Sequence, residues 1–262
     1  MEYSSLRVEN DDGLVRLTLT QPDRGNPIDG DFCREFGAVA DALSSDPGVR
    51  AVLISAEGKA FSFGGDIAAF VGQLDELPLM IRRWTADLHV GIARMQRVDA
   101  PIVAAIHGIC AGGMAGLVAG ADIVVADPQA QFVAAYAGIG FCNDAGSSIM
   151  YARRMGIARA RRFLLLNQTL DAQAALEAGL VDEVTGSGEA HRRAEEVAAK
   201  LAKGPTRAFG EMRRLLASVE YTTLDSQLEL EAQALVRVAG TADAREGLTA
   251  FAQRRRPQFR GE

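Results

Sequence analysis

Glycine-rich loops are the first residues in this sequence that could support chemistry, because they expose backbone N–H groups. The segment at residues 107–116, HGICAGGMAG, places four glycines between an apolar run and an apolar helical pattern. Glycine lets a ligand approach the main chain without a Cβ in the way, and N–H groups at a helix start favour an oxygen with negative charge. The segment lacks the Walker lysine and the GxGxxG order of nucleotide-binding loops. Close packing of a helix on a strand is the alternative explanation.

A second loop of this kind is KAFSFGGDI at residues 59–67, where Asp66 is placed to cap a helix that begins at Ile67. Each of the two loops follows a run expected to be a buried strand. Open α/β sheets bind ligands in a crevice at the carboxyl ends of their strands. The two loops together therefore predict a ligand site at that edge.

Alternating strands and helices are expected to position these loops. Apolar alternation predicts a hairpin, Asp29 is placed to cap a helix through Leu43, and a further helix is expected over 78–97. The predicted strands are 5–10, 14–20, 49–56, 102–106, 122–126, 131–135 and 181–184. This order predicts an α/β fold with much parallel pairing.

The last quarter of the chain reads differently, because its pattern is helical throughout. The predicted helices are 188–203, 205–218 with Pro205 in the first turn, 222–239 and 242–252. The sequence therefore divides into an α/β part over 1–186 and a helical part over 187–262. The last helices carry apolar faces that a single α/β domain has no need to cover.

Composition limits the function classes. The 262 residues are 48% hydrophobic and 24% charged, which suits one large core, and 28 basic against 34 acidic residues give a net charge of −6. An acidic chain without a basic stripe argues against nucleic acid as a partner, and the lack of a long apolar run argues against the membrane. No leader pattern is visible, and three scattered cysteines suit neither a disulfide framework nor a zinc site, so we expect a cytoplasmic protein.

Several motifs, in order, resemble the crotonase (enoyl-CoA hydratase/isomerase) superfamily over essentially the whole chain. They are KAFSFGGDI, PIVAAIHGICAGGMAG (101–116), ADIVVAD (121–127), IGFCNDAGSS (139–148), ALEAGLVDEV (175–184) and TADAREGLTAFAQRRRPQF (241–259). The resemblance implies an α/β spiral of ββα units, with the CoA-thioester site in residues 1–186 and a helical trimerisation region in residues 187–262. It also implies a homo-trimer or homo-hexamer.

The chemistry that this resemblance implies takes place on a coenzyme A thioester, with no permanently bound cofactor and no metal. Two backbone N–H groups would hold the thioester carbonyl and stabilise the enolate that forms beside it. By motif position we expect those N–H groups to belong to Phe63 and Gly113.

Departures from the family pattern bear on the reaction. Family hydratases use two glutamates, and their positions are Gly116 and Tyr136 here, so the acid/base pair for water addition is missing. The remaining acid is Asp144, at a position that certain enoyl-CoA isomerases and 4-chlorobenzoyl-CoA dehalogenase share. It would carry a proton in the former and act as a nucleophile in the latter. Alternatively, Asp144 only caps a helix that begins at Ala145.

His89 matches the position of the histidine that activates water in the dehalogenase, whereas Tyr136 stands where that enzyme has a tryptophan. The tail, residues 227–251, looks more like the isomerase subgroup. The sequence therefore favours an isomerase with Asp144 as base. A dehalogenase-like hydrolase, a hydratase with atypical residues and a non-catalytic family member stay open.

Coenzyme A needs cations for its phosphates and a slot for its adenine. By resemblance, the expected contacts come from the loop PDRGNPI, the second glycine loop and the arginine-rich tail. These residues are Arg24, Gly25, Lys59, Ala60, Phe61, Asp66, Ile67 and Arg254.

Overall fold

The computed structural model describes residues 3–262 and is built on a six-stranded sheet. In spatial order the strands are β1 (Leu6–Asp11), β2 (Leu14–Leu19), β3 (Ala51–Ala56), β4 (Ile102–Ile106), β6 (Ile123–Ala126) and β9 (Glu183–Val184). β1 and β2 form the antiparallel hairpin that the alternation predicts, and every other neighbouring pair is parallel. The sheet thus confirms the predicted α/β fold.

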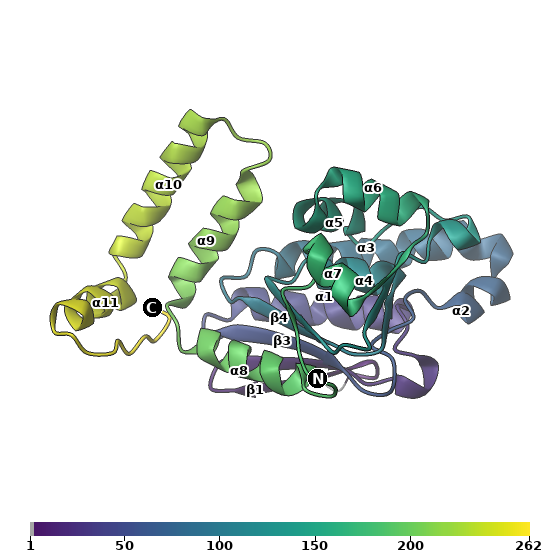
Figure 1. Cartoon of the computed structure of the whole chain (residues 1–262), viewed down its shortest axis with the longest axis horizontal. Helices are drawn as coiled ribbons and strands as arrows, with labels where there is room; N and C mark the ends of the chain where they lie inside the picture. Colours follow the sequence, from purple (N-terminus) through teal and green to yellow (C-terminus); the bar gives the residue numbers. More distant parts are fainter. Residues whose placement is uncertain (1–2) are drawn as a thin grey trace.

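Both faces of this sheet are covered, which explains why its central strands are apolar at every position. In β3, Val52 and Ile54 join the larger core, while Ala51 and Leu53 face a second core. Helices α1 (Gly30–Ser45), α3 (Leu77–Met95) and α4 (Gly112–Ala119) supply the larger core, and α8 (Ala190–Ala202) covers the opposite face (Figure 1).

A second, three-stranded sheet shows how the chain spirals. It consists of β5 (Ile109–Ala111), β7 (Gln131–Val133) and β8 (Thr169–Asp171). After a strand in the large sheet the chain therefore adds a strand to the small one, as β4 does before β5 and β6 before β7. A bridge from Ser62 to Cys110 extends the small sheet to the loop after β3. These are the ββα turns that the motifs imply.

The remaining helices lie at the edges of this core. They are α2 (Ile67–Gly72), α5 (Ser147–Met155), α6 (Ile157–Leu165), α7 (Ala172–Ala178), α9 (Thr206–Ser218), α10 (Leu224–Ala239) and α11 (Ala242–Ala252). Short 3₁₀ turns occupy Pro22–Arg24, Leu74–Glu76 and Ala137–Ile139.

The change from core to protruding helices comes later than residue 186. Three alanines of α8 (Ala190, Ala194 and Ala198) pack on the sheet, so this helix belongs to the α/β body. Only α9, α10 and α11 project away from the body (Figure 1). Pro205 is the residue before α9 rather than part of its first turn. Arg213 of α9 donates to the carboxylate of Asp122, which ties the projecting helices to the core.

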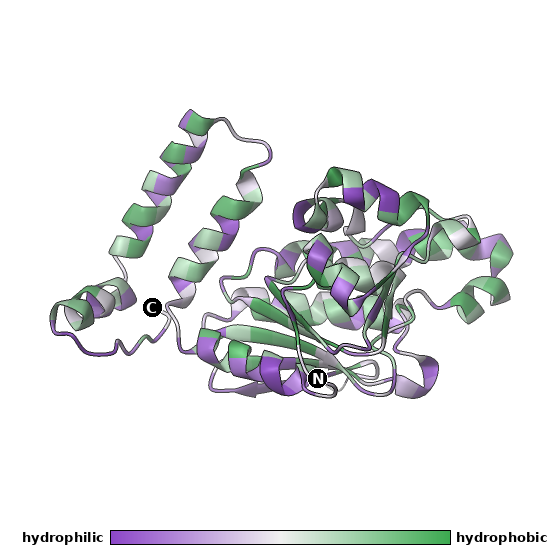
Figure 2. Ribbon diagram, viewed as in Figure 1, coloured by the Kyte–Doolittle hydropathy of each residue, from purple (hydrophilic) through white to green (hydrophobic). Residues whose placement is uncertain are grey.

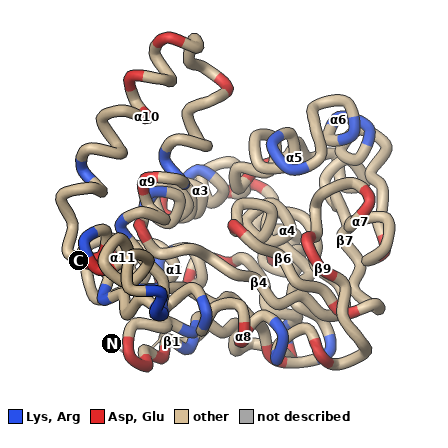
Figure 3. Tube along the Cα trace, turned by 60° about the vertical axis from the view of Figure 1, so that its left-hand side comes forward, with Lys and Arg blue, Asp and Glu red and all other residues tan. Residues whose placement is uncertain are grey.

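The projecting helices carry apolar side chains that the chain itself leaves uncovered. Along α9 and α10, Figure 2 shows apolar and polar residues in alternation. The exposed apolar residues of this region include Leu216, Leu224, Leu228, Leu235, Val236, Leu248 and Phe251. Arginines gather on α5 and α6 (Figure 3), where Arg153 and Arg154 pair with Glu220 and Asp182. Within residues 3–262 no helix is long and apolar enough to cross a membrane.

Candidate active site

A cavity of about 790 Å³ lies where the two glycine loops meet α2, α3 and the segment after β7. Its walls are mostly apolar, as in many small-molecule sites. The polar side chains among its lining residues are Cys33, Thr85, Tyr136, Cys142, Asp144 and Asn167. Among the described residues that line it, Asp144 carries the only carboxyl group. The crevice expected at the carboxyl ends of β3 and β4 is thus present.

Glycine lets the two loops touch each other. Gly64 has φ +86°, and a Cβ there would lie 2.9 Å from the carbonyl oxygen of Ala111. A Cβ on Gly112 would lie 3.8 Å from the Cα of Gly64. Ile28 fastens the second loop, because its N–H donates to the Gly64 carbonyl and its carbonyl accepts from Asp66. The backbone of both loops is therefore fixed in advance of any ligand.

The structure corrects the choice of Phe63 as an oxyanion donor. The Phe63 N–H donates to the carbonyl oxygen of Gly25 at 3.0 Å, so it already has a partner, and the side chain is 56% exposed at the cavity. Two residues further on, Gly65 also lines the cavity, and its N–H makes no hydrogen bond within residues 3–262. Gly65 therefore offers a free N–H from this loop at the cavity.

Gly113 takes the position expected of the other donor. It is the second residue of α4, where a helix has no internal acceptor for the N–H, and it lines the cavity. A Cβ on Gly113 would lie 3.0 Å from Cδ1 of Ile28 and 3.3 Å from Oδ1 of Asp144. The missing side chain thus leaves room between a free N–H group and a carboxylate.

Asp144 is held by its backbone rather than by its side chain. The helix starts at Ser147 and not at Ala145, and the Asp144 carboxylate caps nothing. Instead the Asp144 carbonyl accepts from both the N–H and the hydroxyl of Ser147, at 2.9 and 2.7 Å. Ala145 has φ +52° and Gly146 has φ +73°, so a sharp left-handed turn follows the acid. Left-handed non-glycine residues cluster at functional sites, where the surrounding structure enforces them.

The electrostatic surroundings of Asp144 suit a proton carrier. Burial raises the pKa of this carboxyl group above its ordinary value, and the nearby charge of His89 lowers it by a smaller amount. The carboxyl group accepts no hydrogen bond from the described part of the chain. It is therefore free to contact a ligand in the cavity and is readier to take a proton than an exposed aspartate.

Gly116 and Tyr136 occupy the two positions at which the family hydratases have glutamates. A Cβ on Gly116 would lie 2.5 Å from the Cβ of Ser147, so α4 and α5 approach too closely for a side chain there. Tyr136 lines the cavity, and its hydroxyl lies 3.3 Å from both Ser147 Oγ and the Asp144 carbonyl oxygen. Burial raises the pKa of Tyr136 to about 12, so its hydroxyl stays protonated at neutral pH. Tyr136 therefore braces the Asp144 loop and offers no base.

His89 is near the site but not in it. Its side chain is exposed on α3 and does not line the cavity, whereas Leu88 beside it does. The His89 imidazole could enter the cavity only if its side chain moved. The structure thus brings Asp144, Gly113 and Tyr136 together and leaves His89 at the edge.

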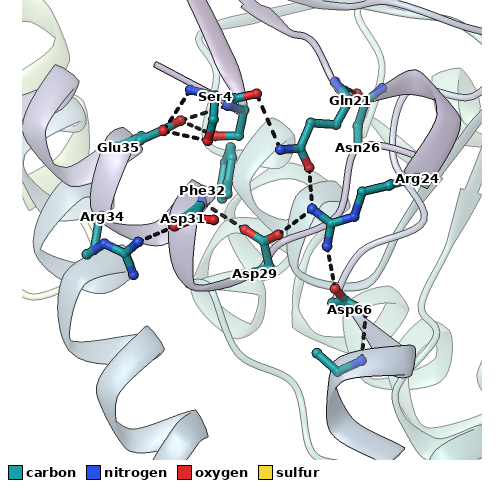
Figure 4. Close-up of polar contacts among 12 residues, drawn as sticks. Ser4, Gln21, Arg24, Asn26, Asp29, Asp31, Phe32, Arg34, Glu35 and Asp66 are labelled. Carbon is teal, nitrogen blue, oxygen red and sulfur yellow. Dashed lines mark hydrogen bonds and ion pairs between the residues drawn. The ribbon is translucent and has the colours of Figure 1, made fainter. Parts of the chain in front are cut away.

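Arg24 joins the starts of two helices, α1 and α2 (Figure 4). Its guanidinium donates to Asp29 at 2.8 Å and to Asp66 at 2.6 Å. Each of these aspartates also caps a helix as predicted, since Asp29 accepts from the N–H of Phe32 and Asp66 from that of Ala69. Because Arg24 is 48% exposed, it keeps donors free toward solvent.

The other residues expected to contact coenzyme A divide into two groups. Lys59 is exposed, and Ile67 lines the cavity, so both are open to a ligand. Phe61 is fully buried, with its ring edge against His107, and it serves packing instead. Arg254 follows α11, at the end of the molecule opposite α2 (Figure 1), so one chain alone does not bring it to the cavity.

Three aromatic side chains form one wall of the cavity, which the sequence patterns did not predict. Phe70, Trp84 and Phe141 come from α2, α3 and the loop that carries Asp144, and all three line the cavity. Their ring centroids are 5.7 Å apart for Phe70 and Trp84 and 5.8 Å apart for Phe70 and Phe141. Helical spacing places Trp84 on a buried face but does not distinguish a core ring from a ring at a cavity.

Comparison with known proteins agrees with the fold. The family model for enoyl-CoA hydratase/isomerase matches residues 9–262, so the chain belongs to that family. The chain is 32% identical over the full length of both proteins to 1,2-epoxyphenylacetyl-CoA isomerase of Escherichia coli (strain K12). It is also 32% identical to 4-chlorobenzoyl coenzyme A dehalogenase-1 of Arthrobacter sp, with 94% of this chain and 90% of that one covered.

Among solved structures, the chain is similar to an enoyl-CoA hydratase from Polaromonas sp. JS666. The TM-score is 0.91 at 28% identity, with 98% of this chain and all of the other covered. The family relationship makes the chain an enzyme of the enoyl-CoA hydratase/isomerase class, and the crotonase-type fold is confirmed.

Proposed function

We propose that this enzyme isomerises the double bond of an enoyl-CoA, with Asp144 as the group that moves the proton. The observation that carries the proposal is the position of the Asp144 carboxylate beside Gly113, in a cavity where no other described lining residue has a carboxyl group. One acid suffices for a proton shift, whereas the family's water addition needs two.

The reaction would use the free N–H groups of Gly65 and Gly113 to hold the thioester oxygen. Asp144 then removes a proton from C2 of a 3-enoyl thioester, and the electron pair delocalises onto that oxygen to give a dienolate. Return of the same proton to C4 yields the conjugated 2-enoyl thioester and restores the carboxylate. Each backbone donor contributes about 3 kcal/mol in comparable oxyanion sites.

Hydration is the less suitable chemistry for this cavity. The approach of Ser147 to Gly116 leaves no room for a glutamate, and the Tyr136 hydroxyl is not a base at neutral pH. A dehalogenase-like hydrolase is a second candidate, because the charge of His89 acts on Asp144. In that reaction Asp144 would attack an aromatic ring and His89 would activate water, which requires the exposed histidine to turn inward.

Coenzyme A would enter past Lys59 and Arg24, which lie on the segments that lead into the lining residues Phe63 and Ile28. Arg24 would keep its aspartate pairs and use its remaining N–H donors for a phosphate. Arg254 would serve only across a subunit boundary. We propose that α9, α10 and α11 form that boundary in a homo-trimer or homo-hexamer, since their apolar residues have no cover within one chain.

The test is a comparison of two thioesters with purified enzyme. A 3-enoyl-CoA should gain the near-ultraviolet absorbance of a conjugated thioester, and 4-chlorobenzoyl-CoA should release no chloride. Asp144→Asn keeps the side-chain size and should lose activity by at least roughly 10²-fold. Chloride release by the unaltered enzyme, without a double-bond shift on any 3-enoyl-CoA, would favour the hydrolase instead.

A further inference from the structure

The aromatic wall lies directly against the residues that would hold the reacting thioester. A Cβ on Gly65 would lie 3.0 and 3.2 Å from two ring atoms of Phe70. The Phe70 ring is therefore in contact with the loop that carries the free N–H group. Asp144 occupies the other side, beside Gly113. The carbons next to the thioester carbonyl would thus lie between a ring and a carboxylate.

Two glycines set the positions of the rings in this wall. Besides the contact of Phe70 with Gly65, a Cβ on Gly30 would lie 2.7 Å from Nε1 of Trp84. Any side chain at either glycine would push a ring away. Phe141 completes the wall from the loop that also carries Asp144, with its N–H bonded to the Tyr136 carbonyl. Phe70 and Phe141 thus contact, or belong to, the segments that carry the reacting groups.

We propose that the acyl group bound in this cavity carries an aromatic ring, which packs against Phe70, Trp84 and Phe141. Aromatic rings prefer offset or tilted neighbours with centroids 4.5–7 Å apart, and the wall already adopts that spacing. Trp84 and Phe141 are only partly buried, so they present ring surface to the cavity. A flexible linear chain would gain burial there but no such ring contacts. This inference names the substrate class for the site under the proposed function.

Trp84 makes the inference testable by binding alone, because it is the only tryptophan in the chain. Its fluorescence would report an acyl group that reaches the wall. The probes are phenylacetyl-CoA and octanoyl-CoA, which are unreactive in isomerisation and have eight acyl carbons each. Free coenzyme A is the control for the nucleotide. We expect both thioesters to change the fluorescence and the phenylacetyl thioester to bind at least threefold more tightly, as one ring contact predicts.

The variant Phe141→Leu removes one ring and keeps an apolar side chain of similar reach. It should lower the preference for phenylacetyl-CoA over octanoyl-CoA while octanoyl-CoA binds as before. Phe70→Leu serves the same purpose if the first variant does not fold, as judged by circular dichroism. Val90→Ala, on an exposed position of the same helix as Trp84, should leave the ratio unchanged.

Equal or tighter binding of octanoyl-CoA to the unaltered enzyme would overturn the inference, as would an unchanged ratio in the ring variants. Failure of the proposed function is distinguishable from this result. An enzyme without isomerase activity but with the ring preference would refute the isomerase and keep the inference. An active isomerase without the preference would do the reverse.

Discussion

The Oδ1 atom of Asp144 lies 3.3 Å from the point at which a Cβ would stand on Gly113. Asp144 carries the only carboxyl group among the described residues that line the cavity, and Gly113 offers a free N–H at the start of α4. A thioester held by that N–H would therefore have its neighbouring carbons within reach of the acid. The proposed proton shift depends on this short separation.

Removal of the Gly113 N–H should slow turnover strongly. Proline at this second helical position has no N–H but fits the helical φ, so Gly113→Pro tests the donor, with an expected loss of roughly 10²–10³-fold in kcat. The matched control is Gly113→Ala, which adds a Cβ at the same place beside Asp144 but keeps the N–H. Comparable losses in the two folded variants would show that cavity shape, not the donor, carries the effect.

Because Gly116 contacts Ser147, a single substitution at Gly116 should not introduce the glutamate of the hydratases without a loss of stability. Gly116→Ala places a Cβ 2.5 Å from that of Ser147, and overpacking of this kind costs roughly 1–3 kcal/mol in unfolding free energy. Thermal unfolding should show the loss. Adding Ser147→Gly should recover part of it, whereas adding Ser147→Ala, which keeps the Cβ, should not. Equal effects of the two second changes would contradict the contact.

The ionised carboxyl group of Asp144 should lower the free energy of unfolding at neutral pH. Because burial raises its pKa, the folded chain holds this proton more tightly than the unfolded chain does. The ionised form is thus unfavourable in the folded state above the native pKa, and the cost vanishes as the pH falls through it. Asp144→Asn should raise the melting temperature at pH 7, with a difference that shrinks in acid. The exposed Asp75→Asn should show no such trend.

The exposed apolar residues of α9 to α11 predict assembly. Leu235 and Phe251 are 70% and 85% exposed, and large exposed apolar surface on a protein marks a site of interaction. Light scattering at micromolar concentration should give a trimer or a hexamer. Leu235→Glu should lower that mass, whereas Val71→Glu on α2, at the other end of the molecule, should not. A monomeric unaltered protein would refute the interface.

Periodicity and turn residues were enough to predict most elements. The hairpin, the helix caps at Asp29 and Asp66 and the C-terminal helices all lie within a few residues of their expected places, because local patterns determine them. The hydrogen-bond partner of the Phe63 N–H was not predictable, because it is the carbonyl of Gly25, 38 positions away in the chain. The same holds for α8, whose small residues read as helix without revealing the sheet beneath.

The transfer of a deuterium label within the substrate tests the proton shift most directly. A 3-enoyl-CoA with both hydrogens at C2 replaced by deuterium should give a 2-enoyl-CoA with part of the label at C4. Because Asp144 is the acid that removes the proton and returns it, Asp144→Asn should show neither the shift nor the transfer. Mass spectrometry of product formed in the first turnovers measures both. A double-bond shift that persists in Asp144→Asn, with the C4 hydrogen drawn wholly from water, would contradict the role of Asp144.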